Sequence, residues 1–282
     1  MKTKRTVNET TKPRVLVVAG SDSGGGAGIQ ADIKTITMLG GFAMTAVTAL
    51  TAQNTLGVQA VLPVDPSFVA AQMKSVLTDI GADAIKTGML GSARVVETVA
   101  RMCESLGAGI PLIVDPVMVA KGGAILLDQS AVDMMVLRLF PFASLVTPNV
   151  PEAEVLTGMK IRALADLERA ADALLALGPS AVLMKGGHLE GDTVVDLLRT
   201  ADGAEHRFEG PRVMSRSTHG TGCTLASAIA AGVAEGLTLQ GAVARARKYV
   251  VRGIELAPGL GHGHGPLEFA HPLLEQAERV GG

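Results

Sequence analysis

The chain has 282 residues, of which 48% are hydrophobic and 18% are charged, and this composition supplies a large core and excludes intrinsic disorder as its main description. The 25 Lys and Arg residues nearly balance the 27 Asp and Glu residues at a net charge of −2, and there are no Trp residues and only one Tyr. Because neither a broad cationic face nor aromatic stacking platforms are available, we expect no nucleic-acid partner.

The cysteines and the N-terminal segment favour a cytoplasmic location. Cys103 and Cys223 lie far apart and form no disulfide framework, which suits a reducing compartment. Residues 1–12 are polar, lack a signal-peptide core, and are predicted to be a flexible tail. Residues 35–64 have no charge, but Gly40 and Gly41 interrupt them, so we interpret them as buried strands and turns and expect no membrane partner.

Apolar runs of strand length alternate along the chain with amphipathic stretches of helical length. Strands are predicted at 15–19, 43–50, 84–86, 112–114, 144–146 and 181–184, and helices at 29–39, 67–80, 93–106, 131–139 and 164–177. A hairpin at 192–199 and 205–208 and two long helices at 224–235 and 239–256 complete the order. This alternation predicts one α/β domain over residues 13–282, with a mainly parallel central sheet covered by helices on both faces.

The first glycine-rich segment, residues 19–32, lies between a predicted strand and a predicted helix. It matches the dinucleotide pattern GxGxxA, but the acidic residue required about 20 positions later is missing, since the next acid after Asp32 is Asp65. It also lacks the Gly-Lys pair of a P-loop. An ordinary glycine turn explains the glycines but leaves Asp22 and Asp32 unexplained at the ligand-binding edge of the sheet.

The second glycine-rich segment, residues 217–224, runs directly into a predicted helix. Gly220 and Gly222 free backbone N–H groups to converge on one point, and the helix N-terminus adds a positive dipole, so we predict an anion hole. The Cys223 thiol at this terminus is expected to have a lowered pKa and to accept a proton or act as a nucleophile. The alternatives are a small buried cysteine and, with His219, a Cys/His hydrolase.

Polar residues also follow three of the other predicted strands. Asp115, Asn149 and Glu152 are candidates for organising a hydrated Mg²⁺, which typically takes one or two carboxylates plus substrate phosphates. Lys185 ends an apolar strand, where an ammonium group can meet a polyphosphate. For each carboxylate or amide the structural alternative is a helix cap or a turn, and for Lys185 it is a solvated strand end.

Taken together, these motifs resemble the bacterial hydroxymethylpyrimidine/phosphomethylpyrimidine kinases of thiamine biosynthesis. The resemblance extends over residues 14–271, with the matching segments at 18–35, 48–55, 86–90, 114–118, 183–188 and 218–224. It implies a ribokinase-like fold, usually homodimeric, that uses ATP and Mg²⁺. It further implies transfer of the ATP γ-phosphoryl group to 4-amino-5-hydroxymethyl-2-methylpyrimidine and then to the resulting monophosphate.

The resemblance also assigns roles to individual residues. It places Gly20, Asp32, Gln53 and Met89 at the pyrimidine, Gly220, Thr221, Gly222 and Cys223 in the anion hole, Lys185 and Asn149 on the nucleotide side, and Asp115 and Glu152 near Mg²⁺. The wider superfamily typically has an Asp base at the position of Cys223, and cysteine there is a feature of the pyrimidine kinases. Our hypothesis is that the Cys223 thiolate is the base.

Two rival functions stay open at this stage. Pyridoxal kinase is the nearest rival enzyme. Cys223 and Gln53 argue against it as the main activity, Gln53 because an amide both donates and accepts and so matches an aminopyrimidine edge, but a side reaction on pyridoxal stays open. The other rival is a ligand-binding protein without turnover. The combination of Lys185, Glu152 and the 220–223 turn argues against that rival, because phosphoryl transfer needs mainly alignment and charge stabilisation.

Overall fold

The structure is a computed structural model that describes residues 12–120, 123–124 and 126–281, with side chains as far as residue 276. The tail predicted at residues 1–12 therefore lies, apart from Lys12, outside the described residues.

The described residues form one nine-stranded sheet in the order β3-β2-β1-β4-β5-β6-β7-β8-β9. The strands from β2 to β7 in this order are parallel, whereas β3, β8 and β9 pair antiparallel at the two ends. The mainly parallel sheet and its edge hairpin confirm the predicted α/β class. The strands are β1 Arg14–Ser21, β2 Phe42–Asn54, β3 Gly57–Pro63, β4 Ala84–Thr87, β5 Leu112–Val114, β6 Leu145–Val146, β7 Ala181–Met184, β8 Thr193–Thr200 and β9 Glu205–Pro211.

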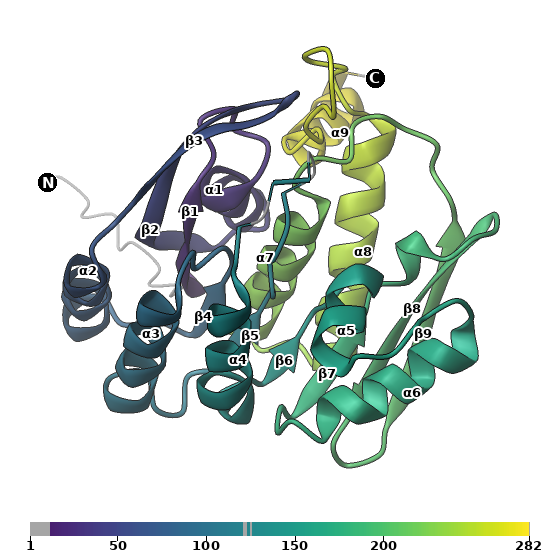
Figure 1. The fold of residues 1–282 in the computed structure, drawn as a ribbon. Coiled ribbons are helices and arrows are strands. Elements are labelled where there is room, and N and C mark those ends of the chain that lie inside the picture. Colours follow the sequence, from purple (N-terminus) through teal and green to yellow (C-terminus); the bar gives the residue numbers. More distant parts are fainter. Residues whose placement is uncertain (1–11, 121–122, 125, 282) are drawn as a thin grey trace, which may run out of the picture.

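Helices cover both faces of the sheet, as Figure 1 shows. Five of them, α2 to α6, pack on one face, and α1, α7 and α8 pack on the other. Side chains of β1 alternate between these layers, with Leu16 and Val18 in the first and Val15 and Val17 in the second. The helices are α1 Gly28–Met38, α2 Pro66–Asp79, α3 Ala93–Ser105, α4 Gln129–Arg138, α5 Val150–Thr157, α6 Leu164–Leu175, α7 Thr221–Ala234, α8 Leu239–Glu255 and α9 His271–Gly281, with short 3₁₀ turns at Phe140–Phe142 and Gly186–His188.

Three elements, β3, α5 and α9, were not predicted. Strand β3 pairs with β2 at the sheet edge and is mostly exposed, so it lacks the alternation of a half-buried strand. Helix α5 has only 8 residues, which is too short for a clear helical period. Within the part of the chain that the structure describes, every helix is too short or too polar to span a bilayer.

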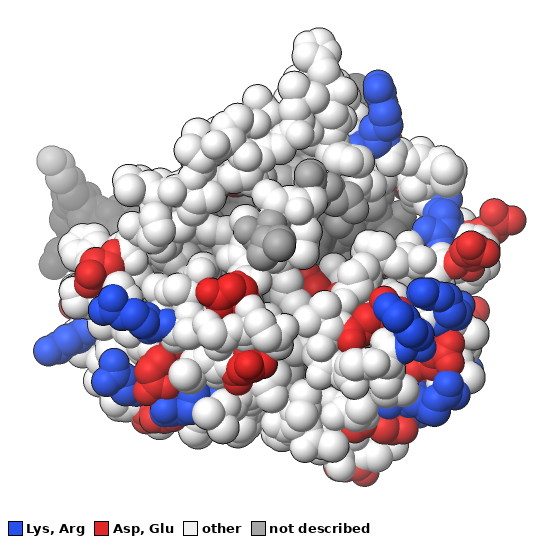
Figure 2. Space-filling view, viewed as in Figure 1, with Lys and Arg blue, Asp and Glu red and all other residues white. Residues whose placement is uncertain are grey.

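Charged side chains of both signs are interspersed over the lower half of the face in Figure 2, and the upper part is largely uncharged. This face therefore has no large patch of one sign. Within the sheet, parallel strands end at a common edge and so bring the loops after β1, β4, β5, β6 and β7 together.

Candidate active site

A cleft of about 1130 Å³ opens at the carboxyl ends of the parallel strands. Every predicted site residue except Asp32 lines it. Its wall is built from the two glycine-rich segments, the loops after β4 to β7, strands β8 and β9, and helix α8. The edge of the sheet thus gathers the residues that the sequence singled out, apart from one.

The two glycine-rich segments pack directly against each other. A side chain at Gly220, whose φ is +80°, would put its Cβ only 1.8 Å from the carbonyl oxygen of Gly26. At Gly28, with φ of +54°, a Cβ would lie 2.4 Å from the carbonyl oxygen of Gly20. Both positions therefore require glycine for conformation and for space, and their close approach brings the N-termini of α1 and α7 together.

The turn at Gly220 exposes the N-terminus of α7. Gly220 is the N-cap and has no side chain to cap the helix, and the first N–H to find an acceptor in the helix belongs to Thr224, 2.9 Å from the Gly220 carbonyl. By helix geometry, the N–H groups of Thr221, Gly222 and Cys223 have no intrahelical acceptor. This arrangement has the donors and the dipole that an anion hole needs.

Cys223 lies beside this turn and lines the cleft. Burial raises the pKa of its thiol to about 11; Lys86 and a hydrogen bond from the Gly28 N–H oppose this change, whereas Asp32 and Asp115 add to it. The expectation of a lowered pKa is therefore wrong for the protein without ligands, because burial and the two carboxylates outweigh Lys86 and the Gly28 N–H. The thiol is protonated at neutral pH.

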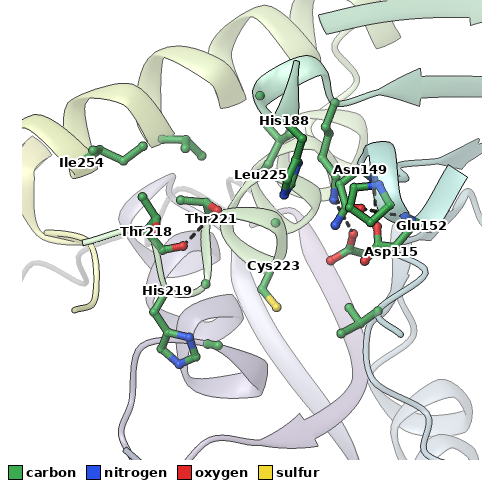
Figure 3. A pocket seen from close by; sticks show the side chains of 18 of the residues that line it. Asp115, Asn149, Glu152, His188, Thr218, His219, Thr221, Cys223, Leu225 and Ile254 are labelled. Carbon is green, nitrogen blue, oxygen red and sulfur yellow. Dashed lines mark hydrogen bonds and ion pairs between the residues drawn. The ribbon is translucent and has the colours of Figure 1, made fainter. Parts of the chain in front are cut away.

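Asp115 and Glu152 lie close together, on the other side of Cys223 from His219 (Figure 3), and Lys185 links the two carboxylates. Its Nζ lies 3.0 Å from Asp115 Oδ1 and 3.9 Å from Glu152 Oε2, and Thr147 donates a further hydrogen bond to Asp115. Burial alone would lower the pKa of Lys185, but the two carboxylates outweigh it and raise that pKa. Burial raises the pKa of Glu152 to about 7, against the opposing effect of Lys185.

Asn149 has a structural task at this position. Its side chain accepts a hydrogen bond from the Glu152 N–H at 2.9 Å, and Glu152 accepts one from the Asn149 N–H at 2.8 Å. This reciprocal capping box starts α5, so the cap anticipated as the alternative for Asn149 is present. The Asn-x-x-Glu spacing was the signal that could have revealed α5 from the sequence.

Asp32 does not line the cleft, and its predicted direct contact with substrate requires a correction. It is fully buried behind the wall, where Lys86 Nζ lies 3.0 Å from one carboxylate oxygen and Ser227 donates to that oxygen at 2.6 Å. Lys86 is fully buried too. Burial alone would lower the pKa of Lys86, but the adjacent carboxylate outweighs it, so its pKa is raised and the ammonium stays charged.

His219 faces the first glycine-rich segment. Its Nε2 lies 2.9 Å from Asp22 Oδ2 and 3.3 Å from the Gln53 amide nitrogen. Figure 3 shows Cys223 between His219 and the Asp115 group, and among the described residues no hydrogen bond joins His219 to Cys223. The Cys/His hydrolase therefore lacks its required pair, and the structure explains Asp22 as the partner of His219.

Gly20 and Met89 form a close contact at the floor of the cleft. A Cβ at Gly20 would lie 2.5 Å from Met89 Cε, so glycine there lets the methionine approach. Thr48 Oγ1 donates to the Met89 carbonyl at 2.6 Å and holds that loop. Gln53 lines the same end of the cleft, beyond the end of β1.

The far end of the cleft contains residues that the sequence reading missed. Asp196 on β8 accepts hydrogen bonds from the Gly186 N–H at 2.9 Å and from Arg247 Nε at 2.7 Å. The Arg247 guanidinium also lies 5.8 Å from the centre of the Phe208 ring. An aspartate with two apolar residues on each side of it in a strand was the available signal.

The oxygen donors of Asp115 and Glu152 suit a hard cation. No cluster of three or more His, Cys, Asp or Glu residues in the described part of the chain is arranged as a complete metal cage. Mg²⁺ does not require one, because it typically takes one or two carboxylates together with water and substrate phosphates. The two carboxylates facing the cleft therefore fit such an ion.

Comparisons with known proteins agree with this geometry. The family model described as phosphomethylpyrimidine kinase matches residues 22–268. A hydroxymethylpyrimidine/phosphomethylpyrimidine kinase of Streptomyces coelicolor is 51% identical over 265 residues, covering 94% of this chain and 97% of that protein. The thiamine biosynthesis bifunctional protein ThiED of Geobacter sulfurreducens is 54% identical over 254 residues, which cover 90% of this chain but only 51% of ThiED.

Among solved structures, an ADP complex of Bacillus subtilis pyridoxal kinase superposes with a TM-score of 0.86 at 32% identity, covering 94% of this chain and 100% of that one. The shared architecture is ribokinase-like, as predicted.

Proposed function

This chain belongs to the phosphomethylpyrimidine kinase family, and we propose that it transfers the γ-phosphoryl group of ATP to 4-amino-5-hydroxymethyl-2-methylpyrimidine and then to its monophosphate. The hydroxyl or phosphate oxygen of the substrate forms a bond to the γ-phosphorus. The bond from that phosphorus to the bridging oxygen breaks, and its electron pair leaves with ADP.

The observation that carries this proposal is the convergence of Lys185 with the N-terminus of α7. A Cβ built on Gly222 would lie 3.3 Å from Lys185 Nζ and 3.6 Å from Asp115 Oδ2. Free backbone donors and an ammonium group therefore face the same small space, as transfer of a phosphoryl group requires. A passive binding protein has no need of this concentration of charge.

Asp115 and Glu152 would hold Mg²⁺, which when bound neutralises charge on the phosphates. Lys185 lies between these carboxylates and the α7 terminus, so it can balance their charge and also contact a phosphate. Asn149 supports the nucleotide side indirectly, because its capping box fixes Glu152.

The pyrimidine lies at the other end of the cleft in this proposal, among Gly20, Gln53 and Met89. Met89 packs on the ring, and the Gln53 amide pairs with the amino group and ring nitrogen of the aminopyrimidine edge. Asp32 supports this end from behind the wall, where its pair with Lys86 holds α1 against β4.

Cys223 accepts the proton of the hydroxymethyl group in this proposal, and it does so as the thiolate. A pKa of about 11 makes the thiolate rare at neutral pH, so alignment and charge stabilisation contribute most of the rate. If the thiolate is the base, the turnover of the wild-type enzyme rises between pH 7 and 9, and Cys223→Ser abolishes the rise. Unchanged turnover of Cys223→Ser across this range would remove Cys223 from the mechanism.

A homodimer is part of the proposal. Leu50 and Leu62 are cross-strand partners on β2 and β3 and are 47% and 64% exposed, and Leu56 in the turn between these strands and Phe68 on α2 are 66% and 61% exposed. Such an apolar edge suits a second copy of this chain. Light scattering should give twice the mass of the chain, and Leu62→Asp should reduce it to the mass of the monomer.

The continuous sheet supports the proposal of a single domain over residues 13–282. A cytoplasmic location stays a prediction.

Pyridoxal kinase is a second candidate because a structure of that enzyme superposes so well on this chain. The test is ADP release by the purified protein with Mg-ATP and hydroxymethylpyrimidine, its monophosphate or pyridoxal. Turnover of both pyrimidines with little turnover of pyridoxal supports the proposal, and Gln53→Ala should then reduce kcat/KM for the pyrimidines selectively. Preference for pyridoxal would identify the protein as a pyridoxal kinase. No ADP release with any of the three substrates would favour a binding protein.

A further inference from the structure

Asp22 is a buried anion that is fully committed to hydrogen bonds. Its side chain is 3% exposed and accepts from the N–H groups of Gly24, Gly26 and Ala27 at 2.8 to 3.0 Å. Burial alone would raise the pKa of Asp22, but hydrogen bonds from His219 and the backbone outweigh it and lower that pKa. An ionised carboxylate only accepts, so each group that contacts it donates.

The contact with Asp22 therefore decides which atom of His219 carries a proton. His219 Nε2 lies 2.9 Å from Asp22 Oδ2, so this nitrogen is protonated and is a donor. The bond to Asp22 orients the imidazole ring, and the backbone N–H of His219, which donates to the Gly265 carbonyl at 3.1 Å, holds the residue in place. His219 also lines the cleft, at the end where Gln53 lies.

Hydrogen-bond direction also determines the orientation of the Gln53 amide. In the structure its Nε2 lies 3.3 Å from His219 Nε2, which would set two donors face to face. Its Oε1 lies 3.3 Å from Thr51 Oγ1, whose single proton is donated to the Ser21 carbonyl at 2.9 Å. A half-turn of the amide suits both neighbours better: Nε2 then donates to Thr51, and Oε1 shares the single Nε2–H of His219 with Asp22, as the longer arm of a bifurcated hydrogen bond.

We propose that His219, held by Asp22, is a specificity-determining positioning residue that locks the amide of Gln53 with its oxygen toward His219 and its nitrogen toward Thr51. One N–H and one lone pair of the amide then face the cleft in a fixed order. They pair with a ring nitrogen beside an exocyclic amino group, the edge that an aminopyrimidine presents and a pyridine alcohol does not. This inference rests on the proposed function, because it assigns substrate selection at the same site.

The hold of His219 on the Gln53 amide, which we call the lock, is tested by removing the Nε2–H donor while keeping an aromatic ring at this position. In His219→Phe we expect the Kd and KM for the aminopyrimidine to rise about tenfold, because the free amide must be ordered on binding. The kcat for the aminopyrimidine and the KM for pyridoxal should stay within about threefold, since neither depends on the amide in this account. His219→Gln, which keeps an N–H donor, should restore most of the affinity.

Two further variants complete the design. Thr51→Val removes the other partner of the amide together with the Thr51 bond to the Ser21 carbonyl, while it leaves the pair of His219 and Asp22 intact. It should weaken aminopyrimidine binding selectively even if His219→Phe fails to fold. His262→Ala alters an exposed histidine that does not line the cleft and should match wild type.

Calorimetry of the aminopyrimidine in the absence of ATP gives the Kd without relying on turnover. A wild type that binds the aminopyrimidine and shows the selective loss, yet releases no ADP, would overturn the proposed function and leave the lock standing. Equal weakening of both substrates, or unchanged binding in both His219→Phe and Thr51→Val, would overturn the lock.

Discussion

Two lysine–aspartate pairs flank Cys223, and they have the same chemistry in different surroundings. Lys86 and Asp32 are 3.0 Å apart and fully buried, with Ser227 completing their hydrogen bonds. The Lys185 to Asp115 distance is also 3.0 Å, but the Lys185 side chain is 14% exposed and both residues line the cleft. The pair of Lys86 and Asp32 is closed off from ligands, and we call it the sealed pair. The pair of Lys185 and Asp115 is open to ligands, and we call it the open pair.

Access to ligands, rather than residue type, separates a structural role from a catalytic role here. Loss of one partner of the sealed pair leaves an uncompensated buried charge, so it should lower the free energy of unfolding. An open pair can exchange its internal partner for a phosphate or a cation. We therefore expect substitutions in the sealed pair to change stability and substitutions in the open pair to change turnover.

The largest effect is expected for Lys86→Met. It leaves Asp32 buried without a cation, and the free energy of unfolding should fall by about 3–5 kcal/mol. Urea denaturation measures this fall, and Lys86→Met combined with Asp32→Asn should recover part of it because no charge is then stranded. Lys160→Met, on a 76% exposed side chain, is the matched control and should change stability by less than about 0.5 kcal/mol. If Lys86→Met were as stable as the wild type, the two pairs would not differ in the way we expect.

Lys185→Met should show the opposite pattern. We expect kcat to fall by about 10²–10³, the usual effect of removing one donor to a developing charge, while stability changes by no more than about 1 kcal/mol. The stability change is small because water reaches the cleft and Glu152 can take up a proton. Single-turnover assays and thermal melts on the same preparation provide both numbers. A stable variant with less than a threefold loss in kcat would contradict the role given to the open pair.

Glu152 lies 3.9 Å from Lys185 of the open pair and makes these three residues, the open cluster, sensitive to pH. Its folded pKa of about 7 lies above the ordinary value of 4.5, so the folded state binds the proton more tightly than the unfolded state. Its contribution to stability is complete below pH 4.5 and is lost as the pH rises to 7, which amounts to up to about 3 kcal/mol. Denaturation across this range should show the slope, and Glu152→Gln should flatten it. Identical slopes in the two proteins would mean that Glu152 titrates normally.

The thiol between the two pairs should give the smallest effect. A pKa of about 11 predicts alkylation of Cys223 about 100-fold slower at pH 7 than for a cysteine at its ordinary value of 9.0, with the rate rising tenfold per pH unit. Mass spectrometry of the two cysteine peptides follows this directly, and the buried Cys103, with its pKa raised to about 12, should react more slowly still. Fast alkylation of Cys223 at pH 7 would instead support the lowered pKa that its place at the helix terminus predicts.

The open cluster was predictable from the sequence because its members follow strands. Asp115 and Lys185 come directly after β5 and β7, and Glu152 follows β6 by a few residues. Parallel strands end at one edge, so a correct order of strands and helices is enough to bring these side chains together. No knowledge of packing distances was needed.

The sealed pair was not predictable in this way. Asp32 follows a glycine-rich turn and was placed at the substrate, while Lys86 was simply part of a short predicted strand. Their pairing depends on how α1 packs against β4, which no local pattern records. The contact of Asp22 with His219, 197 residues further on, and the edge strand β3 were missed for the same reason, since each depends on a tertiary neighbour.

The most direct test of the proposed activity is a time course of the wild type with Mg-ATP and the aminopyrimidine alcohol, followed by mass spectrometry of the pyrimidine products. We predict that the monophosphate appears first and is converted to the diphosphate, with one ADP released at each step, and that Lys185→Met forms neither at a comparable rate. An unphosphorylated pyrimidine in the presence of folded wild-type protein would contradict the assignment, whether or not pyridoxal is phosphorylated in its place.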